Sequence, residues 1–141
     1  MKAVNPYLNF PGTAEEAFLF YRSVFGGEFA MLRRFSDMPA GAQVPATDRD
    51  KILHVALPLA NGSVLMASDA CGPMGSRLVV GNNNYISIAT DSEAETDKLF
   101  AGLSAGGAVE MAPQKMFWGA YFASFADRFG VQWMLNHEYP R

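Results

Sequence analysis

Hydrophobic and polar residues alternate along several short stretches of this chain, and one longer stretch shows helical spacing. Residues 4–10 (VNPYLNF) alternate and predict a strand whose apolar side faces a core. Residues 14–25 place apolar side chains three and four positions apart, which predicts an amphipathic helix. A capping box that begins at Thr13 favours a helix start there, and Gly26 and Gly27 favour its end.

The chain next predicts a short strand, a long loop and a hairpin. Residues 28–35 are typical of a strand, and residues 36–51 are rich in proline and charge, which indicates a surface loop long enough to serve as a lid. Two strand-like runs within residues 52–69 flank the dipeptide Asn61-Gly62, a strong signal for a two-stranded hairpin.

The same order of elements then occurs a second time. A strand is predicted at 84–90, a capping box at Ser92 and Glu95 starts a helix, and three strands follow, at 108–116, 118–125 and 131–138. The pattern therefore predicts an α+β fold of two tandem βαβββ units within a single domain. The expected boundaries are module 1 at about 1–70, a linker at 71–83 and module 2 at about 84–141.

Composition narrows the class of protein. The chain has 141 residues, of which 50% are hydrophobic and 18% charged, as expected for one globular domain. The net charge is −3 and the longest basic cluster is Arg33-Arg34, so we expect no nucleic-acid partner. One cysteine, Cys71, excludes an internal disulfide, and we see neither a signal-peptide core nor a membrane span. We therefore expect a soluble, cytoplasmic protein with no membrane partner.

Three motifs resemble those of one known group of proteins. They are AEEAFLFYRSVFGGE (14–28), ILHVAL…NGSVLMASD (52–69) and FWGAYFASFADRFGVQWMLN (117–136). Together with the doubled βαβββ order, they resemble the vicinal oxygen chelate superfamily of glyoxalases, dioxygenases and bleomycin-resistance proteins, and within it the PhnB-like branch. The resemblance implies two sheets that curl into a cup, helices packed outside, a metal or ligand on the inner face, and a homodimer.

The resemblance also says where a metal would bind. In the metal enzymes of this superfamily a glutamate stands on the last strand of each half, and alignment puts Met66 and Met134 at those places. A first-strand ligand falls on Asn5, with its counterpart at Asn83 or Tyr85. A thioether suits Cu(I) and poorly suits Mg, Mn, Fe, Ni or Zn, so we expect no divalent metal and no other cofactor.

Two side chains with titratable groups allow more than one interpretation. His54 either forms a local hydrogen bond in its strand or lines the cup as a general base, which makes it the candidate catalytic residue. Asp69 ends a strand and is either a cap or turn former or a ligand-contacting carboxylate. His137 is expected on the surface, and Cys71 is expected to be an unreactive bystander.

Strand parity then defines a candidate ligand-binding surface of amide, phenol, imidazole and thioether groups. Such a mixture of apolar and polar groups is typical of small-molecule sites. We therefore predict binding of a small organic molecule; the alternatives are a metal-dependent lyase, isomerase or dioxygenase with an atypical ligand set, and a cup filled by its own side chains. The predicted ligand-binding residues are Asn5, Tyr7, Asn9, His54, Met66, Tyr85, Gln132, Met134 and Asn136, with Trp118 and Tyr121 at the rim.

Overall fold

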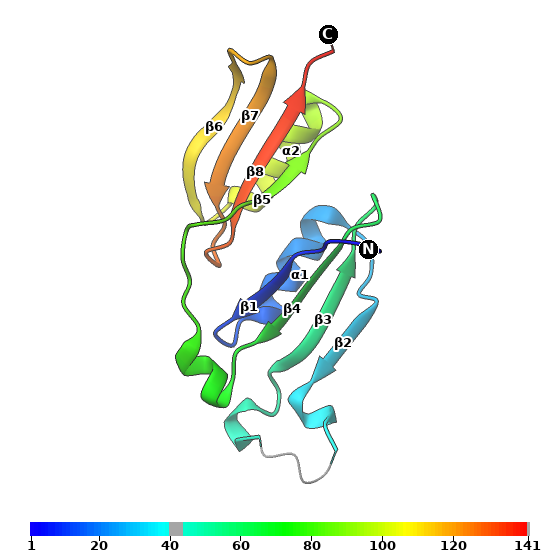
Figure 1. Cartoon of the computed structure of the whole chain (residues 1–141), viewed down its shortest axis with the longest axis vertical. Helices are drawn as coiled ribbons and strands as arrows, with labels where there is room; N and C mark the ends of the chain where they lie inside the picture. The colour runs from blue at the N-terminus through cyan, green and yellow to red at the C-terminus, as the bar shows by residue number, and fades with distance from the viewer. Residues whose placement is uncertain (40–43, 141) are drawn as a thin grey trace. The chain divides into compact units, whose positions relative to one another are not determined.

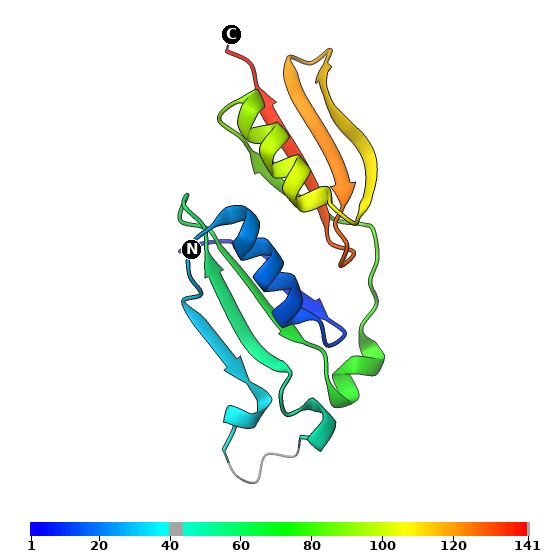
Figure 2. The ribbon, with the colours of Figure 1, turned by 180° about the vertical axis from the view of Figure 1, so that it is seen from behind.

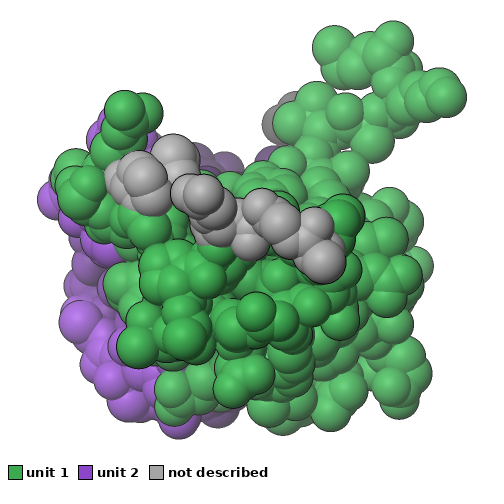
Figure 3. Space-filling view, turned by 90° about the horizontal axis from the view of Figure 1, so that it is seen from below, with its two compact units in different colours: residues 1–79 green, residues 80–141 purple. Residues whose placement is uncertain are grey.

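The computed structural model describes residues 1–39 and 44–140 and divides into two compact units, Met1–Val79 and Val80–Arg141 (Figure 1, Figure 3). Each unit holds one four-stranded mixed sheet and one α-helix in the order strand, helix and three strands. The predicted α+β fold of two βαβββ modules is therefore confirmed. Part of the predicted 36–51 loop, residues 40–43, lies outside the described residues, so the expectation that this loop is a lid stays a prediction.

The first unit contains the predicted hairpin and the first helix. Its sheet has the order β1-β4-β3-β2, in which β1 runs parallel to β4 and the other pairs are antiparallel. Short 3₁₀ turns at Phe35–Asp37, Ala46–Asp48 and Gly72–Arg77 connect its parts. The main elements are β1 (Tyr7–Phe10), α1 (Ala14–Phe25), β2 (Met31–Arg34), β3 (Ile52–Pro58) and β4 (Val64–Asp69).

The second unit repeats this topology with the sheet order β5-β8-β7-β6. In the parallel pairs, Met66 lies opposite Tyr7 and Met134 lies opposite Ser87. The two first strands are therefore offset by 80 residues, which makes Tyr85, and not Asn83, the counterpart of Asn5. The elements are β5 (Ile86–Ala89), α2 (Glu93–Ser104), β6 (Ala108–Met116), β7 (Ala120–Ala126) and β8 (Gln132–Glu138).

Each helix covers one face of its own sheet (Figure 2). Alternate residues of the central strands face the helix and are fully buried, since successive side chains of a strand point to opposite faces. Burial of one such side chain stabilises the fold by about 1.5–3 kcal/mol. The largest buried side chains are Phe10, Phe18, Tyr21, Leu57 and Leu65 in the first unit and Leu103, Phe125, Trp133 and Leu135 in the second.

The two helices begin in different ways. Ser92 accepts a hydrogen bond from the backbone N–H of Glu95 at 3.0 Å, which confirms the second predicted cap. The first predicted capping box is wrong, because the Thr13 side chain forms no cap hydrogen bond. Asp69, at the end of β4, accepts the N–H of Ala14 at 2.9 Å instead. The acceptor comes from 55 residues away, so a local sequence motif does not reveal it.

A β-bulge changes the parity of β3. Arg33 of β2 lies opposite His54, while the next residue, Arg34, lies opposite Ile52, so Leu53 is an extra residue. Leu53 therefore lines the face away from α1, as His54 does, although strict alternation predicts that they point to opposite sides. Val55 keeps the predicted orientation and is fully buried.

Candidate functional site

The face of the first sheet away from α1 gathers four of the predicted site residues, and we call it the open face. Tyr7 and Asn9 come from β1, Met66 from β4 and His54 from β3. Met66 lies between Tyr7 on one side and Ala56 on the other, so it occupies the middle of the face. The helix-facing residues of β3 and β4 are buried, whereas these four are half-buried or exposed and reach solvent.

Tyr7 and His54 interact directly across this face. The Tyr7 hydroxyl and Nδ1 of His54 are hydrogen bonded at 3.1 Å, and the two rings are stacked with their centroids 5.6 Å apart. His54 therefore lies on the open face, and its hydrogen-bond partner comes from β1 and not from its own strand. The hydrogen bond orients the imidazole through one ring nitrogen, so the other nitrogen remains the one suited to a ligand.

The two asparagines near β1 have different roles. Asn5 accepts a hydrogen bond from the backbone N–H of Val64 at 3.0 Å, which fixes the start of β4 beside the segment that precedes β1. Asn9 lies opposite Ser68 and accepts its hydroxyl hydrogen bond at 3.2 Å. Asn5 is thus engaged by the backbone, while Asn9 keeps its amide N–H₂ toward the open face.

The second sheet has a corresponding face with Met134 at its centre. Met134 lies opposite Ser87 of β5 and Ser124 of β7, so a thioether is flanked by two hydroxyl-bearing residues. Gln132 and Asn136 lie on the same face by parity, and the Gln132 amide donates to the backbone carbonyl of Asn84 at 2.6 Å. Trp133 and Leu135 lie on the other side of β8 and are fully buried, as strand parity requires.

Aromatic residues mark two edges of this second face. The Tyr85 hydroxyl donates to the Glu110 carboxylate at 2.6 Å, so the segment before β5 and strand β6 are linked by their side chains. This hydrogen bond raises the pKa of Tyr85, because the neutral phenol is the form that donates. Trp118 lies at the β6–β7 turn with 52% of its surface exposed. Its ring packs edge-on against Phe122, with the ring centroids 5.8 Å apart.

Tyr121 lies on the opposite side of the second sheet from the other predicted residues. Its hydroxyl donates to Asp97 of α2 at 2.7 Å, so it faces the helix. The structure thus does not bring Tyr121 to the rim of the face that holds Met134. His137 lies opposite Tyr121 in the β7–β8 register, and its Nδ1 is 3.2 Å from the Thr90 carbonyl oxygen.

The side chains that most often bind divalent metals are not clustered in the described parts of the two units. Among residues 1–39 and 44–140, no three histidine, cysteine, aspartate or glutamate side chains come together closely enough to hold an ion. The central positions of the two faces carry Met66 and Met134, which are soft, neutral donors. The Glu110 carboxylate lies beside the predicted residue Tyr85 and accepts its hydroxyl hydrogen bond.

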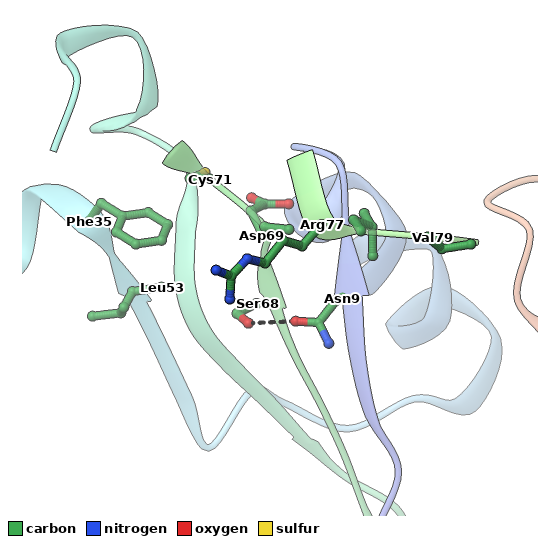
Figure 4. A pocket seen from close by; sticks show the side chains of 10 residues that line it. Asn9, Phe35, Leu53, Ser68, Asp69, Cys71, Arg77 and Val79 are labelled. Carbon is green, nitrogen blue, oxygen red and sulfur yellow. Dashed lines mark hydrogen bonds between the residues drawn. The ribbon is translucent and has the colours of Figure 1, made fainter. Parts of the chain in front are cut away.

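A pocket of about 350 Å³ adjoins the open face of the first sheet (Figure 4). Asn9 and Ser68 belong to both, which makes the pocket continuous with the predicted site. Most of its other lining residues were not predicted as site residues, and the segment after β4 that supplies several of them has only the composition of a linker. The lining residues are Asn9, Phe35, Leu53, Ser68, Asp69, Ala70, Cys71, Arg77, Leu78 and Val79.

Asp69 and Cys71 line this pocket at the end of β4, and neither has the free, ionised group that a reactive site needs. Asp69 is 4% exposed and its second oxygen accepts the N–H of Ile52 at 2.8 Å, so both oxygens serve the backbone. Burial raises the pKa of the Cys71 thiol, and the nearby carboxylates Asp48 and Asp69 raise it further. Cys71 therefore stays a neutral thiol at neutral pH, in line with its expected bystander role.

None of the helices in the described parts of the chain is long and apolar enough to cross a membrane.

Comparison with known proteins finds similarity over nearly the whole chain. The model of the glyoxalase/bleomycin resistance protein/dioxygenase superfamily matches residues 4–135. The protein YjdN of Escherichia coli K12 is 34% identical over 143 residues, which cover 94% of this chain and 93% of YjdN. The crystal structure of PA1353 from Pseudomonas aeruginosa has 38% identity and a TM-score of 0.82, with 98% of each chain covered. The PhnB protein of Bacillus cereus has 25% identity and a TM-score of 0.77, with 96% of this chain and 99% of that chain covered.

Proposed function

Because this chain belongs to the glyoxalase/bleomycin resistance protein/dioxygenase superfamily, we propose that it is a PhnB-like protein that binds a small organic molecule without a divalent metal ion. One observation carries the proposal: the open face of the first sheet gathers Tyr7, Asn9, His54 and Met66 next to a pocket of about 350 Å³. That volume lies within the range of ligand pockets, which are typically about 300–1,000 Å³.

The chemistry of the face supports an organic ligand. Tyr7 and His54 offer flat aromatic surfaces with a polar edge, and Met66 offers a polarizable side chain that adapts to varied shapes. Asn9 adds an amide donor. A few polar groups on a largely apolar wall both bind and orient a small molecule.

A thermal-shift screen of metabolites, followed by binding measurements on two variants, tests this proposal. A compound present at 100 times its Kd stabilises the folded state by about 2.7 kcal/mol, which gives a clear rise in melting temperature. Met66→Arg places a long charged side chain in the middle of the open face and is expected to abolish the rise. The control Leu19→Arg lies on α1, where 44% of Leu19 is exposed, and is expected to retain it.

Two results would contradict the proposal. One is a screen in which no compound raises the melting temperature of the wild-type protein. The other is a compound whose effect is the same in Met66→Arg as in the wild type, which would place its site elsewhere. Circular dichroism of Met66→Arg shows that a lost response does not come from unfolding.

The metal-independent part of the proposal has its own test. Tag-free protein stripped with a chelator is titrated by calorimetry with Ni²⁺, Mn²⁺, Fe²⁺ and Zn²⁺, and we expect no stoichiometric binding. Tight binding of one ion per chain would make the alternative, a metal-dependent lyase, isomerase or dioxygenase, the better proposal. An acid–base role for His54 would then be tested by the activity of His54→Ala.

We also propose that the protein acts in the cytoplasm as a homodimer, with neither nucleic acid nor membrane as a partner. The single cysteine and the net charge of −3 support the location and the absence of nucleic acid. The dimer rests on the resemblance of the sequence to its superfamily. Size-exclusion chromatography with light scattering measures the mass, and a value for one chain of 15.4 kDa would contradict the dimer.

A further inference from the structure

The pocket at the end of β4 is formed within the first unit alone and combines an apolar wall with a polar one. Phe35, Leu53 and Leu78 supply apolar side chains, while Asn9 and Ser68 supply polar ones (Figure 4). A ligand here would therefore have an apolar body and at least one polar group. The charge of that group follows from the ionisable residues that line the pocket.

Arg77 is the cation of the pocket. It comes from the 3₁₀ turn Gly72–Arg77, and Figure 4 shows its guanidinium extended over the pocket in the direction of Leu53 and Ser68. Among the described residues, the arginines in ion pairs are Arg22 and Arg34, and Arg77 joins no ion pair or side-chain hydrogen bond. Its five N–H donors are therefore available to a ligand.

Among the described residues, no ion pair joins Arg77 to Asp69, the carboxylate that lines the pocket. The two Asp69 oxygens instead accept the backbone N–H groups of Ala14 and Ile52. It is 4% exposed and faces those partners, which leaves it little access to a ligand. The Cys71 thiol carries no charge at neutral pH, because burial and the neighbouring carboxylates disfavour the thiolate.

The polar wall also offers a donor. The Asn9 side-chain oxygen accepts from the Ser68 hydroxyl at 3.2 Å, so the amide N–H₂ of Asn9 is left for another acceptor. A guanidinium and an amide N–H₂ at one pocket favour a ligand group that only accepts hydrogen bonds and carries negative charge. Carboxylates and phosphates both have this character, and both pair with arginine through two parallel hydrogen bonds.

We propose that this pocket binds a small organic oxyanion, a carboxylate or a phosphate ester on an apolar body, with Arg77 paired to the anionic group and Asn9 donating to it. The apolar body lies against Phe35, Leu53 and Leu78. This assignment rests on the proposed function, because it names the ligand class of the pocket that adjoins the open face. The proposal adds that the pocket selects its ligand by negative charge and not by shape alone.

Calorimetry with matched probes tests the charge requirement. Benzoate and phenyl phosphate are the anionic probes, and benzamide is a neutral probe of nearly the same shape as benzoate. We expect both anions to bind the wild type and benzamide to bind at least about tenfold more weakly, as a lost charge-assisted hydrogen bond implies. Arg77→Gln should weaken both anions by about tenfold or more and leave benzamide unchanged.

Arg22→Gln is the matched control. Arg22 belongs to α1, which covers the other face of the first sheet, and it does not line the pocket. The substitution removes the same charge from the same unit, so it separates pairing in the pocket from the general field of the protein. We expect the Arg22→Gln variant to bind both anions within about twofold of the wild type, because charges that do not contact the ligand are screened by salt.

The outcomes separate this inference from the proposed function. Equal binding of benzamide and benzoate, or equal losses in Arg77→Gln and Arg22→Gln, overturns the role of Arg77 while organic-ligand binding stands. Failure of every probe, together with a metabolite hit that Met66→Arg abolishes, also overturns the anionic pocket alone. If the metabolite screen gives no hit either, the proposed function fails with it.

Discussion

Substitution of Asp69 should destabilise the first unit more than any change on its surface. The carboxylate joins three parts of the unit, because it sits at the end of β4 and accepts the N–H of Ala14 at the start of α1 and the N–H of Ile52 at the start of β3. Both hydrogen bonds are buried, at 2.9 and 2.8 Å. Removal of the acceptor leaves two backbone donors without a partner in a place that water does not reach.

The magnitude follows from the chemistry of the two hydrogen bonds. A hydrogen bond to a charged group contributes about 1.5–3 kcal/mol, and an orphaned buried donor costs a similar amount. Asp69→Asn keeps one acceptor oxygen but turns an N–H₂ group toward the other donor, so we expect a loss of about 2–3 kcal/mol. Asp69→Ala loses both acceptors, and we expect about 3–5 kcal/mol.

Urea unfolding monitored by circular dichroism measures these losses. A loss of 2–3 kcal/mol should also lower the melting temperature by roughly 5 °C or more. Asp91→Asn is the control, because Asp91 is an exposed aspartate in the turn before α2, and its variant should unfold like the wild type. The reasoning is refuted if Asp69→Asn lies within about 0.5 kcal/mol of that control, or if Asp69→Ala is the more stable of the two Asp69 variants.

Two predictions concern the second unit. The hydrogen bond to Asp97 raises the pKa of Tyr121 to about 12, so spectrophotometric titration should show a late tyrosine ionisation that Asp97→Asn returns toward the ordinary value. The pKa of Tyr121 is higher in the folded state than in the unfolded chain. The stability that this hydrogen bond contributes is therefore complete below the ordinary tyrosine pKa and is lost as the pH rises toward about 12. An unchanged tyrosine titration in Asp97→Asn would contradict this reasoning. Gly107→Ala should destabilise the protein by several kcal/mol, since a Cβ at Gly107 would lie 2.1 Å from the Ala126 carbonyl oxygen, whereas one at Gly81 meets no atom within 4 Å. Thermal unfolding compares the two alanine variants, and equal melting temperatures would show that the backbone moves aside without cost.

The fold was predictable because its signals are local. Alternation of apolar residues marks the strands, and Asn61-Gly62 marks the hairpin, where Gly62 adopts a positive φ that residues with a side chain rarely take. Ser92 marks the start of the second helix through another local interaction, since its side chain accepts a hydrogen bond from the backbone N–H three residues away. Such interactions depend only on neighbours in the sequence.

The features that sequence reasoning missed depend on partners far along the chain. The acceptor for the first helix is Asp69 and not Thr13, and the bulge at Leu53 follows from pairing with β2. No residue close in sequence to Thr13 or Leu53 reveals either outcome. Tyr121 is a different case, because it shares its side of β7 with the buried Ala123 and Phe125, so strand parity turns it toward α2, where it donates to Asp97.

The sequence by itself determined the class of fold, the repeat of strand, helix and three strands, and the presence of Met66 and Met134 at matching strand positions. Periodicity decides these features, because a strand or helix must bury its apolar side whatever lies opposite. Only the tertiary structure decided which side chains share a face and which charge stays unpaired. Arg77 belongs to a stretch with no pattern, and its place in the pocket depends on how the chain after β4 returns over the sheet. Long-range packing of this kind is set by the geometry of the whole unit, which no local period encodes.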